Sequence, residues 1–217
     1  MALETEIKLL VPKDVIARVT QLPALLAAKA YQTQNLRNWY FDTPELRLSA
    51  DKVALRIREQ SGTYIQTFKT KGNSVNGLHQ RGEWEWLIDK PELDISLLVE
   101  ADYPPAKQGV DWAAELEVIF ATNFARTVWI IEWPESDTVI EVALDQGEVS
   151  YTSLQGQTYA DDICELELEL KSGKVEDLMA ASAMFTIAIP ELTPSNISKA
   201  ERGYQLFHLA QECRIND

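Results

Sequence analysis

Three short segments of the chain carry charge at every second residue. They are Glu4-Thr5-Glu6-Ile7-Lys8, Arg56-Ile57-Arg58 and Glu165-Leu166-Glu167-Leu168-Glu169-Leu170-Lys171. Successive side chains of a β-strand point to opposite faces, so each segment places its charges on one face and its apolar residues on the other. Carboxylates are the ligands that hard divalent cations prefer, whereas arginine and lysine bind anions. Several stripes of opposite sign therefore predict the inside of a polar barrel that binds an anion and a metal.

The elements that must hold these stripes are short strands separated by turn residues. Besides the first strand, strand-like spacing covers residues 33–42, 53–59, 63–71, 81–87, 125–132, 139–144 and 163–171. The connectors contain Ser61-Gly62, Gly72-Asn73, Pro134-Glu135-Ser136-Asp137 and Gln146-Gly147, which favour hairpins. The pattern predicts about eight mostly antiparallel strands.

Helical spacing is found in three segments. Residues 12–28 have apolar residues at helical intervals with a proline in the first turn, and residues 175–189 form an apolar segment before Pro190. A last helix begins after the capping residue Ser195 and continues to about Cys213. The chain has no repeat, low-complexity tract or Gly/Ser linker, so we expect one domain over residues 1–217 with no second domain in this chain.

Eight strands are about the number that closes a barrel around a small ligand. Alternation assigns the lumen to one set of polar residues: Glu4, Glu6, Lys8, Arg56, Arg58, Thr67, Lys69, Lys71, Arg81, Glu83, Glu85, Arg126, Glu141, Asp145, Glu165, Glu167 and Glu169. The opposite face carries Ile7, Leu9, Leu55, Ile57, Phe68, Trp84, Trp86, Leu166 and Leu168. The predicted fold class is α+β, an eight-stranded antiparallel β-barrel or tunnel with a charged interior and helices packed outside.

Composition excludes several classes of partner. A formal net charge of −14 over 217 residues opposes an extended nucleic-acid surface. No apolar run has the length of a membrane span, and the N-terminus leads into a charged strand instead of a signal sequence, so we expect a cytoplasmic protein. Cys164 and Cys213 are expected to be buried thiols.

A set of motifs in a fixed order closely resembles the CYTH domain, or triphosphate tunnel metalloenzyme family. Besides the three charged stripes, the motifs are Tyr40-Phe41-Asp42-Thr43-Pro44, the Lys69 strand, His79-Gln80-Arg81, Ala143-Leu144-Asp145-Gln146-Gly147-Glu148 and Ser198-Lys199-Ala200-x-Arg202-Gly203-Tyr204. The resemblance spans nearly the whole chain and is nearest to bacterial inorganic triphosphatases. It implies an eight-stranded tunnel that hydrolyses tripolyphosphate to pyrophosphate and phosphate with Mg²⁺ or Mn²⁺.

The resemblance also implies roles for individual residues. The catalytic residues are Lys8, Arg56 and Arg58. Phosphate would be bound by these three residues together with Lys69, Arg81, Arg126 and Lys199. The metal would be bound by Glu4, Glu6, Glu165, Glu167 and Glu169. Lys199, at the start of a helix, can contribute only if that helix plugs one end of the tunnel.

Structural explanations remain open for some of these residues. Glu4 and Glu6 are also compatible with a solvated edge strand, and Arg81 with pairing to Glu83 and Glu85. Glu141 and Asp145 are expected to orient the basic residues. His79 is expected in a flexible loop, and His208 in the core beneath the last helix.

Other functions on the same fold also remain open. They are an adenylate cyclase, a thiamine or nucleoside triphosphatase, and a non-catalytic module that binds polyphosphate. The first two need a pocket for an organic group, for which the sequence carries no clear signal. Relatives in this branch often have a second, helical domain as a partner after the tunnel, and the sequence does not decide whether this chain is a piece of such a protein.

Overall fold

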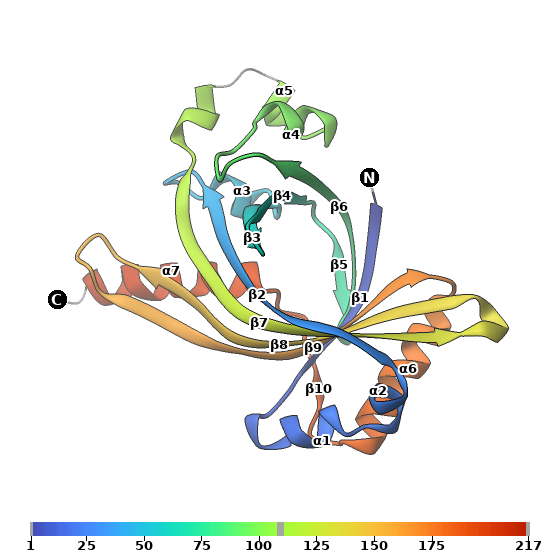
Figure 1. Ribbon diagram of the computed structural model, residues 1–217. Coiled ribbons are helices and arrows are strands. Elements are labelled where there is room, and N and C mark those ends of the chain that lie inside the picture. The colour runs from blue at the N-terminus through green and yellow to red at the C-terminus, as the bar shows by residue number, and fades with distance from the viewer. Residues whose placement is uncertain (1, 108–110, 216–217) are drawn as a thin grey trace.

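The computed structural model describes residues 2–107 and 111–215, which form a single antiparallel sheet with helices on its outside (Figure 1). The strands follow the order β10-β1-β9-β8-β7-β2-β3-β4-β6-β5, and β1 also pairs with β6. This additional pairing closes eight strands into a barrel and leaves β5 and β10 outside the ring. The predicted eight-stranded antiparallel barrel is confirmed.

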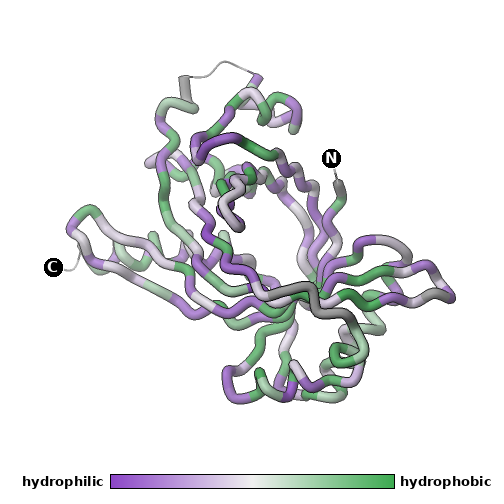
Figure 2. The backbone as a smooth tube through the Cα atoms, viewed as in Figure 1, coloured by the Kyte–Doolittle hydropathy of each residue, from purple (hydrophilic) through white to green (hydrophobic). Residues whose placement is uncertain are grey.

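The barrel strands are β1 (Ala2–Leu10), β2 (Lys29–Asp42), β3 (Ala54–Gln60), β4 (Thr63–Lys69), β6 (Leu78–Ile88), β7 (Glu117–Trp133), β8 (Thr138–Thr152) and β9 (Thr158–Ser172). The two short strands are β5 (Asn73–Val75) and β10 (Thr193–Pro194). Hydrophilic and hydrophobic residues alternate along the barrel strands (Figure 2), as the side-chain alternation of a half-buried strand requires.

Two groups of helices cover the outer face of the barrel. One group, at the bottom of Figure 1, packs on β1, β7, β8 and β9 and consists of η1 (Lys13–Val15), α1 (Ile16–Thr20), α2 (Pro23–Ala27) and α6 (Val175–Ala188). The other, at the top, packs on β3, β4 and β6 and consists of α3 (Arg47–Ala50), α4 (Ser96–Glu100) and α5 (Pro104–Lys107). Two further short turns are η2 (Asp111–Glu115) and η3 (Pro134–Ser136). The apolar core therefore lies outside the barrel wall, as predicted.

The last helix, α7 (Lys199–Ile215), packs differently. Strands β7, β8 and β9 extend past the closed ring, and their inward-facing side becomes apolar there, with Phe120, Val149 and Ile163 in one buried cluster. Helix α7 packs on this surface through Tyr204 and Leu206 (Figure 1). The first turn of α7 is thereby brought to one end of the barrel lumen.

Two local predictions were wrong. Gln146-Gly147 was read as a turn, but Gly147 lies within β8 between Phe124 of β7 and Ile163 of β9. A Cβ atom on Gly147 would lie 2.2 Å from the Asn123 carbonyl oxygen, so glycine is needed there for the close approach of two strands. The turn between β8 and β9 instead contains Gly156, whose φ is +83°.

The helix predicted over residues 12–28 is interrupted. Leu22 is extended, with φ −60° and ψ 133°, and Pro23 begins α2. Proline disfavours a helical conformation in the residue before it and removes a backbone donor, so α1 cannot continue into α2.

Candidate active site

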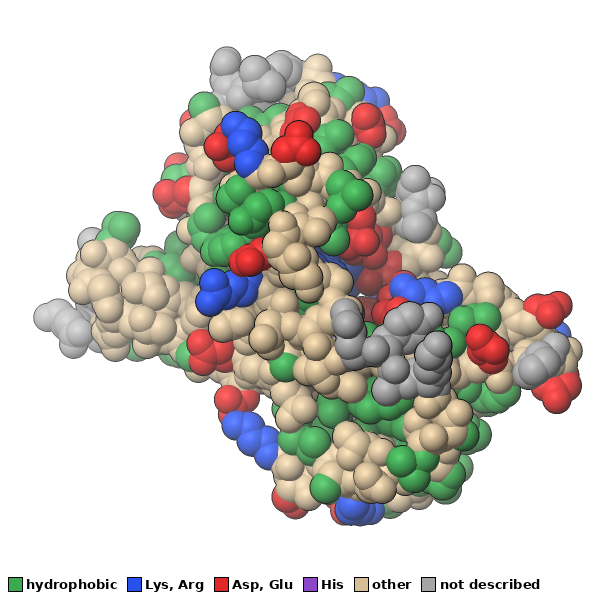
Figure 3. Space-filling view, in the orientation of Figure 1, with side chains coloured by type: hydrophobic (Ala, Val, Ile, Leu, Met, Phe, Trp, Pro, Cys, Tyr) green, Lys and Arg blue, Asp and Glu red, His purple; other side chains and the backbone are tan. Residues whose placement is uncertain are grey.

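The barrel encloses a highly charged cavity of about 240 Å³. Its cationic lining residues are Lys8, Arg56, Arg58, Lys69, Arg81, Arg126, Lys171 and Lys199, and its carboxylates are Glu4, Glu6, Glu83, Glu85, Glu141, Glu167 and Glu169. Acidic and basic side chains are visible in the hollow at the centre of the molecule in Figure 3. Of the residues singled out from the sequence as catalytic, phosphate-binding or metal-binding, only Glu165 does not line this cavity.

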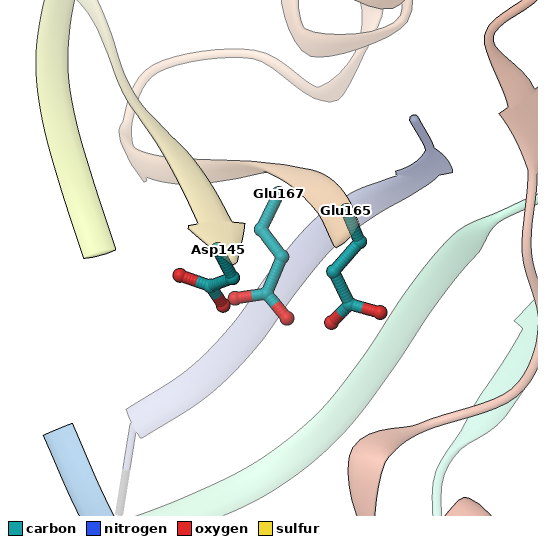
Figure 4. Close-up of side chains that lie close together, drawn as sticks. All are labelled: Asp145, Glu165 and Glu167. Atoms are coloured by element: carbon teal, nitrogen blue, oxygen red, sulfur yellow. The ribbon is translucent and has the colours of Figure 1, made fainter. Parts of the chain in front are cut away.

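Three carboxylates, Asp145, Glu165 and Glu167, lie on the same side of β8 and β9 (Figure 4). One oxygen from each lies within 4.8 Å of the others, a grouping that could hold a metal ion. In the structure, however, ammonium and guanidinium groups bind these oxygens. Lys8 Nζ lies 2.9 Å from Glu165 Oε1, and Lys199 Nζ lies 2.6 Å from Asp145 Oδ2 and 2.8 Å from Glu167 Oε1.

Arg126 completes this buried ion network. Its Nε and Nη2 atoms donate to the two oxygens of Asp145 at 2.7 Å each, and Nη2 also donates to Glu167. Lys8 contacts Glu167 as well, and Lys199 contacts Glu165. Asp145 thus holds Arg126 and Lys199, which agrees with the expectation that it orients basic residues.

The network favours the ionised forms of Asp145 and Glu167. Burial disfavours the charged forms, but Lys199, Lys8 and Arg126 outweigh it and hold the pKa of Glu167 well below its ordinary value. For Asp145, Arg126 and Lys199 likewise outweigh burial and lower the pKa. Because these carboxylates are ionised at neutral pH, they hold the cationic side chains of Lys8, Lys199 and Arg126 in place at this end of the cavity.

We expect the stability of the protein to fall steeply below about pH 4.5, near the ordinary pKa of Asp and Glu. Because the pKa values of Asp145 and Glu167 are lowered in the folded state, the unfolded chain binds more protons in acid. The stabilisation is complete above the unfolded-state pKa and is lost as the pH falls through the folded-state pKa. Melting temperatures between pH 3 and 7 measure this slope, and Asp145→Asn should make it shallower; an equal slope in the variant would contradict the assignment.

A second group of carboxylates lacks such compensation. Glu6 of β1 pairs in register with Glu169 of β9, which pairs with Glu141 of β8. The three carboxylates are direct cross-strand neighbours on one face, an arrangement that is unfavourable without a cation. Within the described residues, Lys171 is 2.8 Å from Glu169 and 3.9 Å from Glu141, and Arg81 is 3.4 Å from Glu6. We call Glu6, Glu169 and Glu141 the carboxylate row.

Electrostatics indicate that the carboxylate row suits a divalent cation. Burial, together with the negative charge of Glu4 and Glu141, raises the pKa of Glu169 despite its contact with Lys171. A cation bound between these oxygens would relieve that repulsion, and carboxylate oxygens are suitable ligands for Mg²⁺ and Mn²⁺. The carboxylate row therefore supplies the type of ligand that a hard divalent ion prefers, while the grouping with oxygens within 4.8 Å of one another among the described residues is Asp145, Glu165 and Glu167.

Arg56 and Arg58 form the opposite part of the wall. They lie on β3, which is separated from β9 by three strands in either direction around the eight-stranded ring, so the two strands face each other across the lumen. Among the described residues, the nearest carboxylate to Arg56 is 3.9 Å away, and its buried Nε has no hydrogen-bond partner. Arg58 donates from Nε to the amide oxygen of buried Asn38 at 3.1 Å, and no carboxylate lies within 4.0 Å of it among the described residues.

The two arginines differ in how well their charge is neutralised. Burial opposes the charge of Arg56, but Tyr40, Glu83 and Glu85 outweigh it and raise the pKa of Arg56. Burial, and then repulsion from Arg56 and Arg126, lowers the pKa of Arg58 to about 10. A lowered arginine pKa means that the fold disfavours the charged form, and an anion in the cavity would favour it.

Lys69, Arg81 and Glu4 connect the two walls. Glu4 accepts from Lys69 Nζ and from Arg81 Nε, both at 2.7 Å, and these cations outweigh burial to hold the pKa of Glu4 well below its ordinary value. Arg81 thus pairs with β1 and not with Glu83 or Glu85, while Glu83 lies 2.9 Å from Lys69.

The position of Lys199 depends on the N-terminus of α7. Ser198 and Glu201 form a reciprocal capping box, in which the Ser198 amide donates to Glu201 Oε2 at 2.7 Å and the Glu201 amide donates to Ser198 Oγ at 3.2 Å. The Tyr204 hydroxyl donates to Asp42 Oδ2 at 2.8 Å. Asp42 also accepts from the backbone amides of Leu48 and Ser49, so one buried carboxylate ties β2, α3 and α7 together.

A second cavity of about 420 Å³ adjoins the first at Ala54, Lys69, Arg81, Ser198 and Ala200. Lys71 lines this second cavity, so its side chain is not placed beside Arg56 and Arg58. The cavity extends the lumen toward the start of α7.

The two histidine predictions were wrong. His79 is buried, with Nε2 2.8 Å from the Ser195 carbonyl oxygen and Nδ1 2.6 Å from Ser74 Oγ, so it connects β6 to the segment before α7. His208 is exposed on α7.

The cavity residues that the sequence did not predict for the lumen include Tyr40, Phe124 and Lys171. Lys171 continues the alternation of Glu165, Glu167 and Glu169, so the same pattern predicts that its side chain faces the lumen. Tyr40 and Phe124 are aromatic residues of long strands, and only strand pairing places them on the cavity wall.

No helix in residues 2–107 and 111–215 is long and apolar enough to cross a membrane.

Among solved structures, a putative adenylyl cyclase from Hippeastrum, described as having a dominant triphosphatase activity, has 19% identity and a TM-score of 0.60, with 95% of this chain and 96% of that chain covered. A putative adenylate cyclase from Bacillus halodurans has 20% identity and a TM-score of 0.56, with 93% and 98% covered. At these identities the similarity shows the fold alone.

A curated relative is more similar in sequence. The inorganic triphosphatase of Haemophilus influenzae is 34% identical over 209 residues, which cover 95% of this chain and 55% of the relative. The chain thus spans about half the length of that relative. The CYTH domain family model matches residues 2–204, and the chain therefore belongs to the CYTH domain family.

Proposed function

We propose that this protein is a metal-dependent inorganic triphosphatase that hydrolyses tripolyphosphate to pyrophosphate and phosphate. The observation that carries the proposal is the arrangement of charge across the lumen: Arg56 and the poorly neutralised Arg58 lie on β3, opposite the carboxylate row. A bound polyanion would neutralise the arginines of β3, and a divalent cation bound with it would neutralise the carboxylate row. The inorganic triphosphatase named among the relatives supports the same assignment.

Arg56 and Arg58 are proposed as the main phosphate ligands because arginine presents forked donors that match phosphate oxygens. Lys8, Lys69, Arg81, Arg126 and Lys199 are proposed to complete the binding surface. Their carboxylate partners hold these side chains in position before the substrate enters. Such preorganised cations stabilise the charge that develops during phosphoryl transfer without further rearrangement.

Glu4 and the carboxylate row are proposed to hold Mg²⁺ or Mn²⁺. Glu165 and Glu167, which the sequence also predicts as ligands, would have to exchange the cations of Lys8, Lys199 and Arg126 for the metal. When bound, the ion would neutralise phosphate charge and lower the pKa of an attacking water.

The test is phosphate release from tripolyphosphate, pyrophosphate, thiamine triphosphate and ATP with Mg²⁺, Mn²⁺ or EDTA. We expect turnover of tripolyphosphate that EDTA abolishes, with little release from the other compounds. Glu6→Gln should lower the metal-dependent rate by about 100-fold or more, as the loss of one oriented charged group in a site often does. Glu132→Gln, on the exposed end of β7, is the matched control.

Other outcomes would point to other functions on this fold. Formation of a cyclic nucleotide from ATP would identify a cyclase, and release from thiamine triphosphate or ATP would identify an organic triphosphatase. Binding of tripolyphosphate without turnover at any metal concentration would leave a binding module. Each of these results would contradict the proposed reaction.

The proposal includes a small-molecule substrate without nucleic acid or membrane as partner, and the cytoplasmic location expected from the sequence. Cys164 and Cys213 are both free thiols, which is usual in a reducing compartment, although Cys164 is only half-buried and Cys213 is exposed. A helical partner domain, as expected for relatives of this branch, remains part of the proposal.

A further inference from the structure

The second cavity, of about 420 Å³, has no role in the proposed reaction. It is larger than the barrel cavity of about 240 Å³, and the two adjoin at Lys69 and Arg81, residues that line both. The start of α7 lies on the same boundary, since Ser198 and Ala200 also line both cavities. The second cavity therefore lies directly beside an anion that is bound by Lys69 and Arg81.

The lining of the second cavity is predominantly cationic. Among the residues that the structure describes, its charged lining residues are Lys52, Lys69, Lys71, Arg81 and Glu201. Four cations thus stand against one carboxylate, in a protein whose formal net charge is −14. Glu201 is also engaged already, because its Oε2 accepts from the Ser198 amide at 2.7 Å. Such a local excess of positive charge on a cavity wall attracts small anions.

Two of these cations, Lys52 and Lys71, line only the second cavity, and their charge is not neutralised by an ion pair. Both residues are exposed, and within residues 2–107 and 111–215 no carboxylate lies within 4.0 Å of either ammonium group. Lys69 and Arg81, by contrast, each lie 2.7 Å from a carboxylate oxygen of Glu4. Lys52 and Lys71 are therefore available to an anion that enters the second cavity.

The backbone places both lysines at this cavity. Lys71 precedes Gly72, where a Cβ atom would lie 2.3 Å from the Gln80 carbonyl oxygen and 2.6 Å from Arg81 Cβ. Glycine thus lets the chain after β4 lie directly against β6, with Lys71 at the same wall as Arg81. Lys52, in the turn after α3, has a φ of +58°, a conformation that glycine adopts with less strain. A lysine at this position is consistent with a role for its side chain.

The lining suits phosphate better than an organic ring. Its ring-bearing residues within the described part of the chain are Tyr204 and His79, and both are buried. The Tyr204 hydroxyl donates to Asp42 at 2.8 Å, and His79 Nε2 lies 2.8 Å from the Ser195 carbonyl oxygen. A nucleobase would therefore find no exposed ring to stack on in this lining, whereas phosphate oxygens would find ammonium and guanidinium donors.

We propose that the second cavity binds the end of a linear polyphosphate longer than tripolyphosphate, with Lys52 and Lys71 as its ligands. The inference rests on the proposed function, because the phosphates held in the barrel cavity are those that the longer chain extends past Lys69 and Arg81. Each added phosphate places negative charge beside cations that tripolyphosphate does not reach. The ligand class is thus an inorganic phosphate chain of four or more units.

Binding of tripolyphosphate and of tetrapolyphosphate, measured by titration calorimetry in EDTA at low ionic strength, tests this site without metal or turnover. We expect wild-type protein to bind tetrapolyphosphate about 10-fold more tightly, the usual effect of one added hydrogen bond to a charged group. In the double variant Lys52→Gln with Lys71→Gln this preference should disappear, while the dissociation constant for tripolyphosphate and the melting temperature stay unchanged.

The matched control is the double variant Lys90→Gln with Lys174→Gln. It removes the same charge from exposed lysines that line neither cavity, so the preference for tetrapolyphosphate should remain. Loss of the preference in this control would overturn the proposal, because it would show an effect of net charge alone.

Two further results would also overturn it. One is equal binding of the two anions by the wild-type protein, and the other is an equal loss of affinity for both anions in the double variant of Lys52 and Lys71. Failure of the proposed function gives a different result, since the wild-type protein would then not bind or hydrolyse tripolyphosphate at all.

Discussion

Replacing Arg58 by alanine should lower kcat/KM for tripolyphosphate by about 100- to 1,000-fold, the range found when an enzyme loses one preorganised donor to a developing negative charge. The same change should leave the melting temperature of the metal-free protein unchanged or raise it. Arg58 has no carboxylate partner within 4.0 Å among the described residues, and burial followed by repulsion from Arg56 and Arg126 lowers its pKa to about 10. At neutral pH its charge is therefore unfavourable to the fold and favourable to the bound anion.

Initial rates with excess Mg²⁺ and thermal unfolding in EDTA measure the two halves of this prediction. Arg37→Ala is the matched control, since Arg37 is an exposed residue of β2 that does not line the cavity. A loss of activity that follows a comparable loss of stability would contradict the assignment of Arg58 to substrate binding, because it would show that Arg58 stabilises the barrel.

Replacing Lys8 by alanine should disturb the fold as well as the site and cost about 3 to 5 kcal/mol of stability, the usual penalty when one member of a buried ion pair is removed. Lys8 is 1% exposed, and its ammonium group lies 2.9 Å from Glu165, which is fully buried. Within the part of the chain that the structure describes, Glu165 Oε2 already lacks a hydrogen-bond partner. Without Lys8, the negative charge of Glu165 would depend on Lys199 and Arg202 alone among the described residues.

Urea unfolding at pH 7 measures this effect, and for a chain of this size the melting temperature should drop on the order of 10 °C. Lys13→Ala removes a lysine from a surface pair with Asp162, in which both side chains are at least 65% exposed, and should leave the stability nearly unchanged. Combining Lys8→Met with Glu165→Leu should restore part of the stability, because an apolar pair can replace a buried ion pair. Equal effects of Lys8→Ala and Lys13→Ala would show that the buried network adds nothing to the fold.

These two variants distinguish two kinds of cation in one cavity. Lys8, Lys199 and Arg126 are held by carboxylates at hydrogen-bond distance, so their loss disturbs the fold as well as the site. Arg56 lies 3.9 Å from Glu85 and 4.0 Å from Glu83, and Arg58 has no carboxylate within 4.0 Å among the described residues, so neither guanidinium group is held by a carboxylate at hydrogen-bond distance. The unpartnered Nε of buried Arg56 is consistent with this division.

Much of the fold and of the cavity lining follows from local sequence pattern. Alternation with period two depends on the geometry of one strand, so Glu4, Glu6 and Lys8 could be assigned to one face without knowledge of any other strand. The same rule assigned Arg56 and Arg58 to the lumen and Leu55 and Phe68 to the outer core. The family motifs added the expected tunnel and its ligands, which alternation by itself does not specify.

Only the tertiary structure decided which charges meet. Lys8 and Glu167 are 159 residues apart, and the carboxylate row exists because β1, β9 and β8 pair in one register. A shift of one residue in either pairing would turn these side chains to the other face. Register depends on the packing of the whole barrel, so no local pattern could show that Glu6 faces Glu169 while Glu165 faces Asp145.

The position of α7 also depended on the tertiary structure. Gly147 and Gly156 are both glycines in a polar context, and only the close approach of β7 and β8 shows that one lies within a strand and the other in a turn. The resulting strand extension gives α7 its packing surface and brings Lys199 to the cavity. The sequence by itself therefore determined which residues face the lumen, because that property is local to each strand. The partners of those residues were decided by the tertiary structure, because strand register and helix docking bring together segments that are far apart in the chain.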